Sequence, residues 1–182
     1  VSMAESLYYH NLRHLHENAP TFQQAWELQG MRKKGLKIPP ACADPAFLQY
    51  KNACSLGAQV QRLLSKVPAS RVLIIDLADL KDCPKREYQR VMRFLDLDGD
   101  RESFFPENEA RVPRSLFVQR IMMFGGGIRR AIGLKKGFGL LKFNEKKIKK
   151  KPMSRSFYDC INQAFREDKA LLNELIKKQR SF

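Results

Sequence analysis

The sequence predicts an α/β fold in which helices flank a parallel sheet. The main observation is the run Val72–Ile75, which is apolar, rich in β-branched residues and without polar alternation, as in a strand covered on both faces. Segments with helical spacing of apolar residues surround this run, at residues 1–17, 44–65, 84–95 and 154–176. A lone buried strand would leave its backbone groups without partners, so we expect neighbouring strands, either upstream of Val1 or in segments without a clear pattern.

Local signals mark where several of these helices begin. Thr21 and Gln24 have the spacing of a capping box, which predicts a short second helix. Asp44-Pro45 predicts an N-cap followed by proline in the first turn of a helix that runs to about residue 65. Pro84 and Ser154 are expected to start the two later helices.

The composition describes a folded, strongly basic chain. It has 182 residues with 34 Lys or Arg and 19 Asp or Glu, so the net charge is +15. A hydrophobic fraction of 43% excludes a disordered polycation, and the length suits one domain over residues 1–182. No apolar run is long enough for a membrane span, and no signal peptide is visible. The charge predicts an anionic partner without choosing among a nucleotide, a nucleic acid, an anionic glycan and a membrane surface.

Metal ligation is not predicted. The four cysteines form no CxxC or CxxH pattern, which favours buried free thiols in a reducing compartment. His10, His14 and His16 are spaced by four and two residues, so one helical face cannot carry all three. Residues 125–152 are rich in glycine and lysine and are predicted to form a long basic loop.

The stretch from Val72 to Leu97 resembles a segment of the sulfotransferases that use 3′-phosphoadenosine 5′-phosphosulfate (PAPS). In that family a buried strand ends in a Tyr-Glu-Asp-Leu-like turn, and a Pro-initiated helix follows and closes with Phe-Leu-Gly-Leu. The matching positions here are Asp79, Leu80, Pro84, Phe94, Leu95 and Leu97. The departures are Leu77 for Tyr, Ala78 for Glu and Asp96 for Gly.

Both ends of the chain extend this resemblance, in order. The family has an Arg-Asn/Asp-Pro-Val turn with a Ser eight residues after the Arg; Val1 would be that Val, and Ser6 that Ser. Residues 21–26 and 153–175 are similar to segments of bacterial and glycan-type members. The resemblance implies a P-loop-type sheet and a single sulfotransferase-like domain, truncated at its N-terminus, because the loop that binds the phosphosulfate is missing.

The resemblance also implies a reaction and part of a donor site. A sulfuryl group would pass from PAPS to a hydroxyl or amine of a small-molecule or glycan acceptor, leaving 3′-phosphoadenosine 5′-phosphate (PAP), with no metal. Ser6 would bind the 3′-phosphate, and Lys135, Lys136 and Gly137 are similar to the family's Arg-Lys-Gly-x-x-Gly phosphate loop. The catalytic base would come from upstream of Val1. Bacterial cytoplasm is the expected location, with the Golgi lumen as the alternative for a truncated chain.

Other interpretations stay open at this point. Ser6 also fits a solvent-facing helix serine, and residues 125–152 also fit a solvated basic loop. Phe138 and Phe143 among the lysines would suit a nucleic-acid-binding module, although the sequence contains no recognised motif of that kind. A further alternative is a non-catalytic protein that binds an anion, a glycan or a membrane surface.

Overall fold

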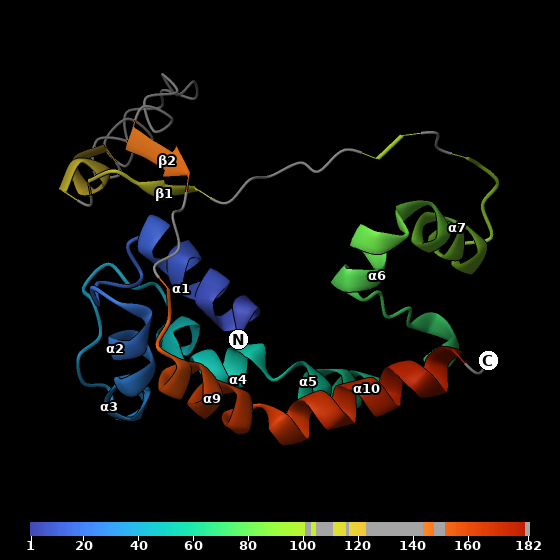
Figure 1. Cartoon of the computed structure of the whole chain (residues 1–182), viewed down its shortest axis with the longest axis horizontal. Helices are drawn as coiled ribbons and strands as arrows, with labels where there is room; N and C mark the ends of the chain where they lie inside the picture. Colours follow the sequence, from blue (N-terminus) through green and yellow to red (C-terminus); the bar gives the residue numbers. More distant parts are fainter. Residues whose placement is uncertain (101–102, 105–110, 116, 123–143, 148–151, 181–182) are drawn as a thin grey trace. The chain divides into compact units, whose positions relative to one another are not determined.

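The computed structural model describes residues 1–100, 103–104, 111–115, 117–122, 144–147 and 152–180 (Figure 1). The chain forms two compact units. Unit 1 comprises Val1–Cys54 and Glu109–Phe165, and unit 2 comprises Ser55–Asn108 and Arg166–Phe182. The single domain expected over residues 1–182 stays a prediction.

The predicted parallel sheet, and with it the P-loop-type α/β fold, is wrong. The described part of the chain is mainly helical, and its one sheet is an antiparallel pair of three-residue strands. The strand β1 (Arg111–Pro113) pairs with β2 (Glu145–Lys147), with Arg111 opposite Lys147. Residues 72–76 belong to neither strand, although the backbone is extended at Val72 and Asp76.

Unit 1 is built from short helices, some of which begin where local signals predict. Their bounds are α1 Ser2–Arg13, α2 Phe22–Glu27, α3 Gln29–Lys33, the 3-10 helix η1 Pro45–Leu48, α4 Tyr50–Cys54 and α9 Arg155–Ala164, together with helical residues 117–122. The side chains of Thr21, Asp44 and Ser154 accept hydrogen bonds from the first turns of α2, η1 and α9. These predicted caps are therefore confirmed.

The continuous helix predicted from Asp44 to about residue 65 is wrong. The segment consists of η1, α4 and a third helix, α5 (Leu56–Leu64). Gln49 (φ −93°, ψ 69°) and Ser55 (φ −79°, ψ 77°) have non-helical backbone angles and separate the three pieces. The second break also coincides with the boundary between the two units.

An aromatic cluster forms the core of unit 1. Phe22 is at its centre, with ring centroids 5.7 Å from those of Tyr8, Tyr50 and Phe157 and 6.1 Å from that of Trp26. Helices α1, α2, α4 and α9 supply most of the buried residues of this cluster, and Ala19 and Phe165 lie outside them. The Tyr8 hydroxyl donates to the Ala19 carbonyl at 2.9 Å, which satisfies its polar end inside the core.

A buried ion pair lies beside this core. The Arg32 guanidinium donates to both oxygens of Glu17 at 2.6 Å, and both side chains are fully buried. The Tyr50 hydroxyl donates to the same carboxylate at 2.7 Å, and the N–H groups of Asn18 and Ala19 donate at 2.8 Å. Burial alone would raise the pKa of Glu17, but the hydrogen bonds from Arg32, Tyr50 and Ala19 outweigh it and hold the pKa below its ordinary value.

Unit 2 is held together differently. It contains α5, the 3-10 helix η2 (Ala69–Arg71), α6 (Leu77–Asp82), α7 (Pro84–Phe94) and α10 (Arg166–Arg180). All the buried hydrophobic residues in the described part of the chain lie in unit 1 and none in unit 2. Helix α5 packs along α10, where the Asp168 carboxylate accepts from the N–H groups of Gly57 (3.0 Å) and Ala58 (2.9 Å). Asp168 thereby satisfies two of the free N–H groups at the start of α5.

The segment predicted as a buried strand lies in unit 2 and takes its hydrogen bonds from side chains. The Ile74 N–H donates to Gln179 Oε1 at 2.8 Å, and Gln179 Nε2 donates to the Val72 carbonyl. Arg90 donates to the Ile74 carbonyl at 3.4 Å. One side-chain amide thus takes the place of a neighbouring strand, and Ile75 remains 40% exposed instead of covered.

We predict that Gly57→Ala destabilises unit 2. A Cβ at Gly57 would lie 2.3 Å from the Asp168 carbonyl oxygen, so α5 and α10 would have to separate, at a cost of about 1–3 kcal/mol. Gly30→Ala is the matched control, because Gly30 is also the second residue of its helix and has open space around it. Urea denaturation measures the free energy of unfolding of both variants. An equal loss in Gly57→Ala and Gly30→Ala would contradict the close packing of α5 on α10.

We predict that Arg32→Met lowers the free energy of unfolding by about 3–5 kcal/mol at neutral pH, because it leaves the Glu17 carboxylate buried without its cation. Lys33→Met, at an exposed position of the same helix, should change it by less than about 0.5 kcal/mol.

The wild type and Arg32→Met should also differ in how their stability depends on pH. In the wild type the lowered pKa of Glu17 stabilises the fold above its ordinary pKa, and this contribution is lost as the pH falls through the lowered value. In Arg32→Met burial should raise the pKa of Glu17, so the carboxylate becomes protonated as the pH falls and no longer destabilises the fold as a buried charge. The difference in free energy of unfolding between wild type and variant should therefore become smaller at low pH. Denaturation at neutral pH and at about pH 3.5 tests this; a gap that stays constant would contradict the role of the pair.

Candidate functional site

Ser6, the predicted 3′-phosphate ligand, lies on the exposed side of α1. Its side chain makes no hydrogen bond with the described residues, so the hydroxyl is available to a ligand. Ser6 is the fifth residue of the helix, one turn beyond Ser2 on the same side. The N–H of Glu5 already donates to the Val1 carbonyl at 3.1 Å, so the free N–H groups of α1 precede Ser6 by about a turn.

The other predicted site residues, Lys135, Lys136 and Gly137, lie outside the described residues, as does most of the predicted loop 125–152. Within that range the structure describes only residues 144–147 and 152. Ser6 is therefore the one member of the predicted phosphate-binding set whose surroundings the structure describes.

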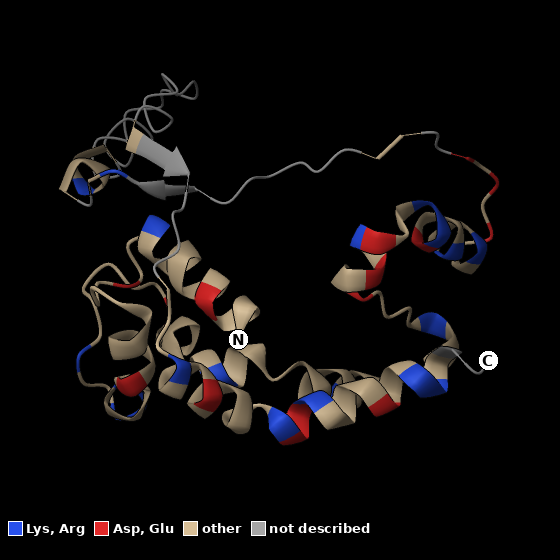
Figure 2. Cartoon of the chain, in the orientation of Figure 1, with Lys and Arg blue, Asp and Glu red and all other residues tan. Residues whose placement is uncertain are grey.

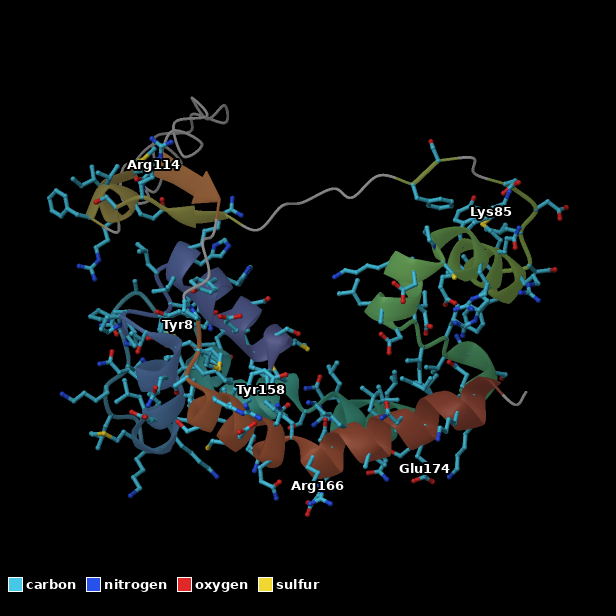
Figure 3. The ribbon with its side chains drawn as sticks, viewed as in Figure 1. Tyr8, Lys85, Arg114, Tyr158, Arg166 and Glu174 are labelled. Carbon is cyan, nitrogen blue, oxygen red and sulfur yellow. The ribbon has the colours of Figure 1, made fainter. Side chains whose placement is uncertain are left out.

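Unit 2 contains a cavity of about 600 Å³ that the sequence analysis did not predict. Arg86, Arg90 and Arg93 line it from α7, where their spacing of four and three residues places them on one face. The carboxylates of Asp79 and Glu87 lie in the same lining. Figure 2 shows the basic residues along α7, and Figure 3 labels Lys85 in the first turn of this helix. The spacing of the arginines is visible in the sequence and could have indicated this face.

The charges of the cavity are partly paired. Glu87 is buried and accepts from Arg90 and, at 3.2 Å, from Arg86. Arg86 also lies 3.3 Å from Asp79. Arg93 donates to the Gln89 carbonyl at 3.4 Å and forms no ion pair with any residue that the structure describes. Three guanidinium groups thus face two carboxylates, and Arg93 is the cation left for an anionic ligand.

The three histidines of unit 1 lie in a row, although their spacing predicts that no single helical face carries them. The ring centroids of His10 and His14 are 4.5 Å apart, and those of His14 and His16 are 6.1 Å apart. Because α1 ends at Arg13 and Leu15 has a positive φ of 60°, the chain reverses and returns His16 beside His14. Burial lowers the pKa of His14, and the neighbouring charges of His10, Arg13 and His16 lower it further.

In the ranges covered by the structure, no group of three or more His, Cys, Asp or Glu side chains could hold a metal ion. The expectation of buried thiols is correct for Cys54, whose pKa is raised to about 11 by burial. It is wrong for Cys83 and Cys160, which are exposed, and Cys42 is half-buried.

The comparisons with known proteins give no relative: no family model, curated protein or solved structure matches this chain. No helix among the described residues is both long and apolar enough to cross a bilayer.

Proposed function

We propose that this chain binds PAPS and takes part in the transfer of its sulfuryl group to a hydroxyl or amine of a small-molecule or glycan acceptor. The observation that carries the proposal is the resemblance in sequence order, from Ser6 through residues 72–97 to the last helices. The local structure of residues 76–94 supports it. The side chain of Asp76 caps α6, and Pro84 begins α7, which ends at Phe94, as in the turn and Pro-initiated helix of the family.

In this proposal Ser6 recognises the donor. PAPS differs from other adenine nucleotides by its 3′-phosphate, and an exposed hydroxyl without a competing hydrogen bond is suited to donate to a phosphate oxygen. Lys135 and Lys136 would add positive charge, and Gly137 would let the backbone approach the phosphate.

The remaining chemistry is an in-line displacement. The bond between sulfur and the bridging oxygen of the 5′-phosphate breaks while the acceptor oxygen or nitrogen bonds to sulfur, and the acceptor loses a proton to a base. Positive groups stabilise the charge that develops on the leaving phosphate. No residue of this sequence is assigned as the base, so the proposed part of this chain is to bind and orient the donor.

A second candidate function is non-catalytic binding of an anion in the cavity of unit 2. The observation that favours it is the arginine face of α7, with Arg93 unpaired among the described residues. Such a site would bind an anion through charge and a planar guanidinium, without the selectivity for a 3′-phosphate that the first proposal requires.

We predict that Ser6→Ala weakens binding of PAP by about 1–3 kcal/mol, the range for a hydrogen bond to a charged group, and leaves binding of 5′-AMP nearly unchanged. The difference arises because only PAP carries the 3′-phosphate. Titration calorimetry at physiological salt measures both affinities. Ser156→Ala is the control, since Ser156 is another exposed helix serine, in α9.

Arg93→Gln separates the two candidate functions. If it abolishes binding of PAP and 5′-AMP alike while Ser6→Ala has no effect, the cavity is the anion site and the proposed donor site is wrong. If the wild type binds duplex DNA but not PAP, both candidate functions are excluded and a nucleic acid is the partner.

A further inference from the structure

The short helical segment 117–122 of unit 1 exposes an unusually apolar side. Phe117 is 71% exposed and Ile121, one turn later, is 56% exposed. Val118 lies between them and is 40% exposed. Aromatic and aliphatic side chains in such a group indicate a surface that contacts another apolar phase.

The opposite side of this segment is fixed to unit 1. Gln119 is buried, and its amide donates to the Arg13 carbonyl at the end of α1 at 3.0 Å. The side chain of Asn144, also buried, donates to Gln119 Oε1 at 3.2 Å and to the Ser115 carbonyl at 2.9 Å, and its Oδ1 accepts from the Ser115 N–H at 3.1 Å.

This amide network determines the direction of the apolar side. With Gln119 held inward against α1, Phe117 and Ile121 are directed to solvent because they occupy the other positions of the turn. Their exposure therefore follows from the way in which Gln119 attaches the segment to α1.

The sequence around the segment is strongly basic. Arg114, labelled in Figure 3, and Arg120 are both exposed, and each lies three residues from Phe117 in the sequence. Residues 109–165 contain 14 Lys or Arg and 3 Asp or Glu, a net charge of +11. Unit 2, in contrast, contains 14 Lys or Arg and 12 Asp or Glu, a net charge of +2. The apolar side chains thus lie in the part of the chain with the greatest excess of positive charge.

We propose that segment 117–122 docks on an anionic lipid surface. Phe117, Val118 and Ile121 enter the boundary between headgroups and acyl chains, while Arg114 and Arg120 meet the lipid phosphates. A nucleic acid would match the charge but leave the aliphatic side chains in water, whereas an anionic bilayer covers both. This inference does not depend on the proposed sulfotransferase activity and extends it by locating the chain at a membrane surface.

Co-sedimentation with vesicles tests the proposal. The full chain is mixed with vesicles of phosphatidylcholine alone or of phosphatidylcholine and phosphatidylserine in a ratio of about 7:3, at physiological salt. We expect binding to the anionic vesicles, at least about tenfold weaker for the double variant Phe117→Ser/Ile121→Ser because most of the buried apolar area is lost. The matched control is Leu77→Ser/Leu97→Ser, which removes side chains of similar exposure (62% and 55%) from unit 2. It should bind as the wild type does.

A second variant reports insertion directly. Phe117→Trp, made with Trp26→Phe to leave one tryptophan, should show a blue-shifted emission with anionic vesicles and quenching by brominated lipid. Equal vesicle binding by Phe117→Ser/Ile121→Ser and wild type, or an emission that does not shift, would mean adsorption by charge alone and would overturn the proposal. Failure of the wild type to bind anionic vesicles, with or without binding to duplex DNA, would overturn it as well.

Discussion

The packing of unit 1 depends on the buried Glu17 carboxylate and its ion pair with Arg32. The carboxylate accepts hydrogen bonds from Arg32 in α3, from Tyr50 in α4 and from the turn that follows α1, so one side chain joins two helices and this turn. A buried ion pair contributes little net stability compared with apolar packing, but breaking it is costly because one charge is left unsolvated. Its effect is therefore to restrict how the short helices pack around the aromatic cluster centred on Phe22.

The two units differ in what holds them together. Unit 1 has the aromatic core, the buried ion pair, most of the positive charge and the exposed apolar segment 117–122. Unit 2 has no buried hydrophobic residue among those described, and its contacts rely on Asp168 and Gln179, whose side chains bond to backbone groups distant in sequence. Apolar burial supplies most of the free energy of folding, so unit 2 should open more readily than unit 1.

Structural features that depend on neighbouring residues could be predicted from the sequence. Features that depend on residues distant in the sequence could not. The caps at Thr21, Asp44 and Ser154 were predictable because a cap involves only the first turn of its helix. The prediction of a strand at Val72–Ile75 was wrong, because this segment takes its hydrogen bonds from the side chain of Gln179, more than a hundred residues away. At the candidate site the role of Ser6 stays a prediction, because an exposed helix serine fits both interpretations of the sequence. The cavity of unit 2 is lined by residues of η2, α7 and α10, which are far apart in the sequence, so no local pattern indicates it as a whole.

The most direct test of this account is native-state hydrogen exchange, resolved by residue. Amides in α1 and α9 are expected to exchange only through the largest unfolding events, with free energies close to the global value, because these helices pack on the aromatic core. Amides in α5 and α10 should exchange through a smaller, separate opening. If α5 and α10 are as strongly protected as α1 and α9, and all four respond equally to denaturant, the chain unfolds as one cooperative body and the division of stability proposed here is wrong.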